Sequence, residues 1–94
     1  MDIVVVRSGG VAGMTRRGAV NLEQLGERAP EWHSLVQESL PILDRLAEEP
    51  APHRVPDGFV WQIGVGDRSC EMADSYLTGP LRELAERTLR EGRR

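Results

Sequence analysis

The sequence predicts an α+β fold, in which a four-stranded antiparallel sheet carries two main helices on one face, in the order ββαββα. Three observations predict it. Apolar segments that are β-branched or alternating occur in two pairs, and glycine lies between the two members of each pair. Each pair is followed by a segment with apolar residues at helical spacing. A proline-rich stretch separates the two units, and we expect residues 1–94 to form a single domain.

The first unit opens with two strands joined by a glycine-rich loop. Ile3 to Arg7 is largely β-branched and apolar, which is typical of a strand with one or two buried faces. Met14 to Asn21 is a weaker strand candidate, because Gly18 lowers the stability of a strand interior. Three of the five residues in the loop 9–13 are glycine, more than a tight hairpin needs. The loop therefore serves either an unusual turn or close contact with a partner.

A long helix is predicted from Pro30 onward, because proline suits the first turn of a helix. Before it, residues 22–29 form a connection in which Leu22 and Leu25 pack on the core. Pro41 interrupts the helical pattern, so the helix is either kinked or split there. The expected buried stripe consists of Trp32, Leu35, Val36, Ser39, Leu40, Leu43, Leu46 and Ala47.

The second unit follows a linker, residues 49–58, which holds three prolines in seven positions. A strand is predicted over residues 59–65, where apolar side chains alternate with others and form a half-buried face. A short turn at residues 66–67 leads into a partner strand over residues 68–73. On that strand we expect Cys70 to face inward as a buried structural cysteine.

The closing helix is predicted to have Thr78 or Gly79 as its cap and Pro80 in its first turn. Gly92 is a typical helix stop. The expected buried stripe consists of Leu81, Leu84, Ala85, Thr88 and Leu89.

Composition argues against several classes of partner and location. A net charge of −3 without a basic stripe argues against nucleic-acid binding. No apolar run approaches the roughly 20 residues that a membrane-spanning helix needs, and the start of the chain does not resemble a secretory leader. A single cysteine excludes an internal disulfide. We therefore expect a cytoplasmic protein without membrane contact.

All twelve basic residues are arginine, and lysine is absent. Codon bias in a GC-rich genome is the simpler explanation. The functional alternative is a surface that grips carboxylates with guanidinium groups.

No catalytic or metal-binding set is visible. His33 and His53 are twenty residues apart, and nothing in the spacing brings either to Cys70 as the base that a nucleophile needs. A zinc site would need three or four ligands at short spacings. We therefore expect neither enzymatic activity nor a cofactor. Trp32 and Trp61 either anchor a partner or belong to the core, and their amphipathic positions favour the core.

The sequence around the glycine loop resembles the N-terminus of the emfourin family. These are small cytoplasmic bacterial proteins that inhibit thermolysin-like zinc metallopeptidases such as protealysin. Members typically have a short apolar strand, a glycine-rich loop with an aromatic residue, and a Thr-Arg-like strand start. Val11 stands where the aromatic residue is usual, a departure that bears on binding strength and target preference. The matching residues are Ser8, Gly9, Gly10, Ala12, Gly13, Thr15 and Arg16.

The resemblance implies an inhibitor that occupies the substrate cleft of a thermolysin-like metallopeptidase through its loop at residues 8–13. The small size of the chain separately favours a monomer when free. Met1 and Asp2 are further candidates for reaching the cleft. The implied contact residues are Arg7, Ser8, Gly9, Gly10, Val11, Ala12, Gly13 and Arg16.

The alternative is a non-enzymatic adaptor that binds a protein through an exposed sheet edge or through the acidic middle of the chain. An exposed edge strand is a ready template for a further strand. This hypothesis predicts that changes at the edge matter more than changes in the loop.

Overall fold

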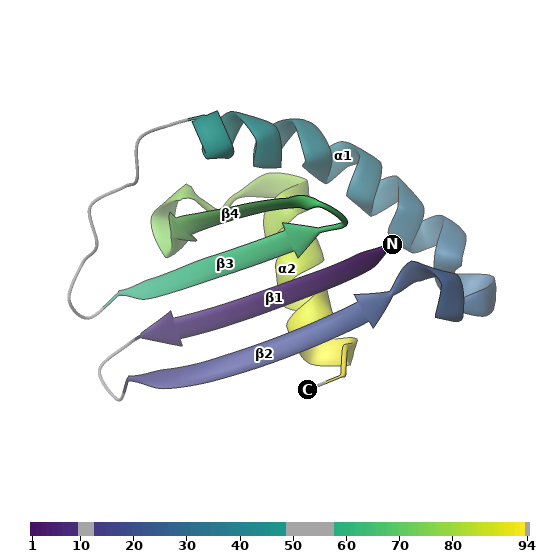
Figure 1. Cartoon of the computed structure of the whole chain (residues 1–94), viewed down its shortest axis with the longest axis horizontal. Coiled ribbons are helices and arrows are strands. Elements are labelled where there is room, and N and C mark those ends of the chain that lie inside the picture. The colour runs from purple at the N-terminus through teal and green to yellow at the C-terminus, as the bar shows by residue number, and fades with distance from the viewer. Residues whose placement is uncertain (10–12, 49–57, 94) are drawn as a thin grey trace.

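The computed structural model describes residues 1–9, 13–48 and 58–93 and confirms the predicted α+β fold (Figure 1). The sheet is antiparallel throughout, with the strand order β2-β1-β3-β4. The two central strands therefore come from different units of the chain. The strands are β1 (Asp2–Gly9), β2 (Met14–Asn21), β3 (Phe59–Val65) and β4 (Arg68–Ala73), and the long helices are α1 (Ala29–Glu48) and α2 (Gly79–Glu91).

Both helices pack on one face of the sheet, and the hydrophobic core lies between the two layers. On β1, Ile3 and Val5 are fully buried while Val4 and Val6 on the other face are half-buried, as the two-residue period of a strand requires. Trp32 and Trp61 are both buried in this core, as predicted. No helix of the described residues is long and apolar enough to cross a membrane.

The predicted stripe of α1 is confirmed over most of its length. Five of its residues are buried, whereas Leu40 and Leu46 are half-buried. Ala47 is exposed, so its predicted burial is wrong: no described element covers this side of the last turn. The buried residues are Trp32, Leu35, Val36, Ser39 and Leu43.

Pro41 lies inside one continuous helix, so the predicted alternative of a split helix is wrong. Figure 1 shows α1 as a curved, uninterrupted ribbon. Pro41 is exposed, and the buried Ser39 donates its hydroxyl hydrogen to the carbonyl oxygen of Leu35 at 2.6 Å. A proline on the solvent side of a curved helix is tolerated, because the carbonyl that it leaves without a donor there is open to water.

Short 3₁₀ turns form the connections between the long elements. The turns η1 (Leu22–Gln24) and η2 (Gly26–Arg28) precede α1, and η3 (Asp74–Tyr76) precedes α2. Leu22 is buried and Leu25 packs against the core, as predicted.

Gly18 allows the C-terminal half of α2 to rest directly on β2. A Cβ atom at this position would lie 2.4 Å from the carbonyl oxygen of Thr88, closer than real Cβ contacts come. The glycine that weakens the strand pattern in sequence is therefore the residue that lets helix and strand backbones touch.

Gly92 ends α2 at the predicted residue, but not in the left-handed conformation typical of a helix stop, since its φ is −77°. It also lies against β2, where a Cβ would be 2.8 Å from the backbone nitrogen of Ala19. The next residue, Arg93, pairs with Ala19 through two backbone hydrogen bonds of 2.7 and 2.8 Å. The C-terminal segment thereby covers part of the β2 edge.

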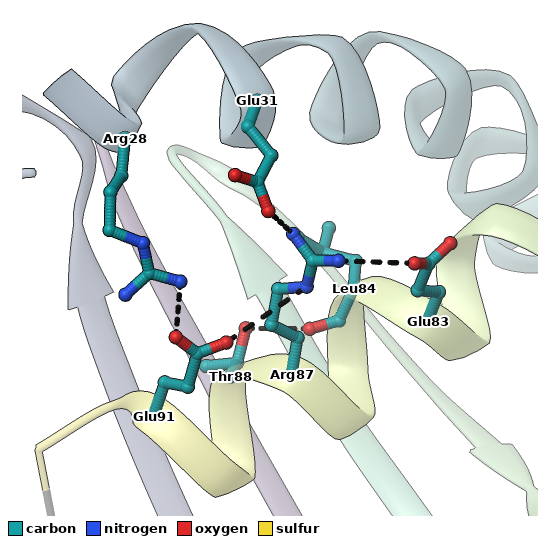
Figure 2. Close-up of polar contacts among 7 residues, drawn as sticks. All are labelled: Arg28, Glu31, Glu83, Leu84, Arg87, Thr88 and Glu91. Atoms are coloured by element: carbon teal, nitrogen blue, oxygen red, sulfur yellow. Dashed lines mark hydrogen bonds and ion pairs between the residues drawn. The ribbon is translucent and has the colours of Figure 1, made fainter.

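A network of ion pairs joins the two helices, as Figure 2 shows. The guanidinium of Arg87 on α2 pairs with Glu31 on α1 and, within its own helix, with Glu83 at 3.2 Å and Glu91 at 4.0 Å. Arg28, which precedes α1, pairs with Glu91 in turn. Because the Arg87 side chain is only 19% exposed, this network is better shielded from solvent than an ordinary surface pair.

Cys70 packs against the core, as predicted for an inward-facing residue, but its predicted burial is only partial, since the side chain is half-buried. The reason is its place on β4, which is an edge strand and therefore has no neighbouring strand on its outer side.

Candidate functional site

The structure fixes both ends of the glycine-rich loop. Gly9 and Gly13 have φ values of +108° and +63°, in the left-handed region that favours glycine. A Cβ on Gly9 would also lie 2.5 Å from the carbonyl oxygen of Gly58, whereas one on Gly13 would meet no atom of the described residues within 4 Å. The predicted contact residues Gly10, Val11 and Ala12 lie outside the described residues.

The strand register places Gly9, where the loop begins, beside the start of β3. Gly9 is opposite Met14 on one side and opposite Phe59 on the other. We call this end of the sheet the loop end and define it by Gly9, Gly13, Met14, Gly58 and Phe59. Directly opposed residues project to the same face, so the two large side chains lie on one side of the sheet. Met14 is 68% exposed and Phe59 is 38% exposed, and neither is covered by a helix to the extent that the core is.

Arg7 and Ser8 project to opposite faces. Arg7 is opposite Arg16 on β2 and Trp61 on β3, on the face that the helices cover. Its guanidinium carbon lies 4.6 Å from the ring centroid of Phe59 and 5.6 Å from that of Trp61, which is the geometry of cation–π contacts.

Ser8 faces the open side of the sheet with Thr15 and Val60. The predicted contact residues that the structure describes therefore share one end of the sheet but not one face.

Met1 and Asp2 do not belong to this end. Asp2 begins the same strand that Gly9 ends, so the two residues are separated by the length of β1, about 23 Å at roughly 3.3 Å per residue. The two N-terminal residues therefore lie at the far end of the sheet from the loop (Figure 1).

Comparison with known families supports the resemblance seen in the sequence. The family model for emfourin matches residues 5–89, which spans nearly all of the sheet and both helices. The chain belongs to the emfourin family. Emfourins are known as metallopeptidase inhibitors, and membership supports an inhibitor role with a protease as the partner. No curated protein and no solved structure shows a significant match to the chain.

In this emfourin, sequence reasoning missed two side chains of the loop end as functional candidates. Met14 was predicted only as the first residue of a strand, and Phe59 only as part of a half-buried alternating face. The position of Met14 could have been found from the sequence, because a hairpin predicted with its turn in residues 10–13 makes Gly9 and Met14 cross-strand partners. Phe59 is brought beside Gly9 by the pairing of β1 with β3, which local sequence does not encode.

The open face of the emfourin sheet carries a shallow hollow of about 450 Å³. Val4 and Val6 form its apolar floor, and the hydrogen-bonded pair of Gln62 and Glu71 borders it. This hollow faces away from the residues that the sequence implicates on the helix-covered side. Within the described ranges, no group of three or more His, Cys, Asp or Glu side chains is placed to hold a metal ion.

Proposed function

We propose that this chain inhibits a thermolysin-like zinc metallopeptidase by placing the loop end of its sheet in the substrate cleft. The observation that carries the proposal is the pair of exposed apolar side chains, Met14 and Phe59, on either side of a loop whose flanking glycines adopt left-handed backbone conformations. Exposed apolar side chains grouped at one end of a small protein mark an interaction surface.

The strand that leads into the loop, β1, is well suited to inhibition. β1 is hydrogen-bonded to a neighbouring strand on both sides along most of its length, so the chain that enters the loop is held by the sheet. A pre-organised segment loses little conformational entropy on binding. Such a loop can pair its backbone N–H and C=O groups with an enzyme strand as an extended substrate does. Held from both ends, the contact segment at residues 8–13 would resist the geometry that cleavage requires.

The experiment is a titration of a thermolysin-like metallopeptidase with the chain, following hydrolysis of a peptide substrate. Gly13→Val is the informative variant and Gly26→Val is its matched control. Both glycines have a φ near +60°, and no atom of the described residues lies within 4 Å of either Cβ position, so both substitutions introduce the same backbone strain. Gly26 lies in the connection before α1, far along the chain from the loop.

We expect stoichiometric inhibition by the native chain and by Gly26→Val, and weaker inhibition by Gly13→Val. Equal inhibition by all three proteins would show that the loop is not the contact segment. Absence of inhibition by the native chain across several such peptidases would contradict the proposed target class.

We further propose that residues 1–94 act as a single emfourin-like domain that is cytoplasmic and monomeric when free. One core cluster draws side chains from both strand–strand–helix units among the described residues, which supports the single domain. Sedimentation of the free chain tests the monomer directly.

For the adaptor alternative, the edge strand β4 is the better candidate for the exposed sheet edge. On the other edge, the backbone groups of Ala19 in β2 are already paired with Arg93. If the chain were such an adaptor, substitutions on the outer edge of β4 would abolish partner binding while Gly13→Val would not.

A further inference from the structure

A small hollow lies next to the loop end, on the helix-covered side of the sheet. It measures about 160 Å³ and lies between α2 and the strands β1, β2 and β3. Three arginines from three different elements line it: Arg7 on β1, Arg16 on β2 and Arg90 on α2. The remaining lining comes from Trp61, Glu86 and Leu89. We call the hollow with its three guanidinium groups the arginine pocket.

Carboxylates of the described residues do not pair with the arginines of the pocket. Arg7 and Arg16 are direct cross-strand partners, an arrangement that is unfavourable for like charges. Among the described residues no ion pair reaches Arg7, Arg16 or Arg90, whereas four other arginines each pair with a carboxylate. Those four are Arg28, Arg68, Arg82 and Arg87.

Glu86 is the one acidic side chain that lines the pocket among the described residues, and it is already engaged. Its carboxylate oxygen lies 3.1 Å from the Nε atom of Arg82, one turn earlier on α2. Counted over the described residues, the pocket therefore keeps an excess of positive charge, although the net charge of the chain is −3.

One arginine of the pocket is held in place before any partner arrives. The guanidinium of Arg7 lies over the rings of Phe59 and Trp61. Trp61 is itself fixed, because its indole nitrogen donates a hydrogen bond to the Oδ1 atom of Asp74 at 2.9 Å. A planar guanidinium that is already oriented loses less side-chain entropy when it forms paired hydrogen bonds.

We infer that the arginine pocket binds a carboxylate side chain of the protein partner. The inference rests on the proposed function, since that partner is the peptidase and the carboxylate then lies beside its substrate cleft. Guanidinium groups match a carboxylate with two parallel hydrogen bonds, and a hollow of this size holds one such group. Arg7 and Arg16 lie within the residues 5–89 that match the family model, and Arg90 lies just outside them.

The test is charge reversal with a control on the same strand. Arg16→Glu and Arg90→Glu reverse charges inside the pocket. Arg17→Glu makes the same change one residue further along β2, where the side chain projects to the open face opposite Val6. We expect each pocket variant to weaken inhibition about tenfold or more and to reduce its dependence on salt, as loss of a charge pair at an interface does. Arg17→Glu should stay within about twofold of the native chain, because its charge lies on the other face.

Misfolding does not account for the expected loss. Arg16→Glu replaces a like-charge pair with an opposite-charge pair opposite Arg7, so its thermal stability should equal or exceed that of the native chain. If the native chain inhibits and neither pocket variant differs from it, or if Arg17→Glu is as weak as Arg16→Glu, the arginine pocket is not a contact and the proposed function stands without it.

A second readout decides the inference if the native chain inhibits no peptidase. The side-chain Nε–H signals of a ¹⁵N-labelled native chain are followed by NMR while a tetra-aspartate peptide amide is added, with a tetraserine amide as control. Saturable shifts of Arg7, Arg16 and Arg90 with the acidic peptide alone support a carboxylate site. No shift, or equal shifts at Arg17, overturns it.

Discussion

Individual glycines in this fold have different structural roles that the sequence alone does not distinguish. Gly18 and Gly64 both lie inside strands with ordinary backbone angles. At Gly18 the backbone of α2 fills the space that a side chain would need. At Gly64 the nearest described atoms are carbonyl oxygens 3.8 Å from the Cβ position. Only the packing of a distant helix distinguishes the two positions.

This difference gives a direct prediction for stability. Gly18→Ala should lower the free energy of unfolding by about 2–3 kcal/mol, because the new methyl group overlaps the Thr88 carbonyl and forces α2 away from the sheet. Gly64→Ala should be neutral or slightly stabilising, within about 1 kcal/mol, because the methyl group fits and the unfolded chain loses freedom. Urea denaturation of both variants checks this. Equal destabilisation would contradict the close approach at Gly18.

The exposed side chains of the loop end make a second prediction at this scale. Met14→Ser should weaken inhibition about tenfold, because the proposed contact surface loses an apolar side chain. It should leave stability unchanged because the side chain is 68% exposed. Tyr76→Ser is the control: Tyr76 is 48% exposed and lies on η3, which follows β4 at the edge of the sheet opposite to β2. Inhibition constants and melting temperatures of the two variants are the measurements. Equal inhibition by both would remove Met14 from the contact surface.

At the scale of elements, the bounds of strands and helices could be predicted closely from sequence. Glycine and proline mark the ends of the elements, and between them apolar residues repeat every two residues in strands and every 3.6 residues in helices. Strands β2, β3 and β4 therefore have the predicted ends. β1 extends the predicted strand by one residue at its start and two at its end. What could not be predicted depends on pairing between elements. The position of Phe59 at the loop end, the grouping of Arg7 and Arg16 with Arg90, and the role of Gly18 all require the β1–β3 register and the placement of α2, which are long-range properties.

The joint between the two helices gives a prediction at the same scale. Arg87→Ala should lower the free energy of unfolding by about 1–3 kcal/mol, because it removes a largely buried guanidinium that pairs with both helices and lies 5.8 Å from the Trp32 ring. Arg45→Ala is the control, since Arg45 is exposed on α1 without an ion pair among the described residues; its effect should stay within about 0.5 kcal/mol. Thermal denaturation distinguishes them. Similar melting temperatures would mean that the network does not hold the helices together.

For the molecule as a whole, the last turn of α2 and the residues after it connect the helical layer back to the sheet. Gly92→Val should disrupt this junction, because a side chain there collides with Thr88 and with the backbone of Ala19. We expect faster hydrogen exchange at the Ala19 amide and a loss of about 1–2 kcal/mol in stability. Arg93→Ala keeps the backbone pairing and should exchange as slowly as the native chain. Unchanged protection in Gly92→Val would show that the pairing does not restrain β2.

The far end of the sheet is equally well defined. The carbonyl oxygen of Met1 accepts a hydrogen bond from the backbone nitrogen of Leu22 at 3.0 Å, and this end is separated from the loop by the full length of β1. A molecule tethered through its N-terminus, to a bead, a sensor chip or a fused protein, would thus hold its loop end outward and away from the support. Because the N-terminus and the loop end lie at opposite ends of the sheet, several such chains attached to a common scaffold by their N-termini would all present the proposed contact loop in the same direction.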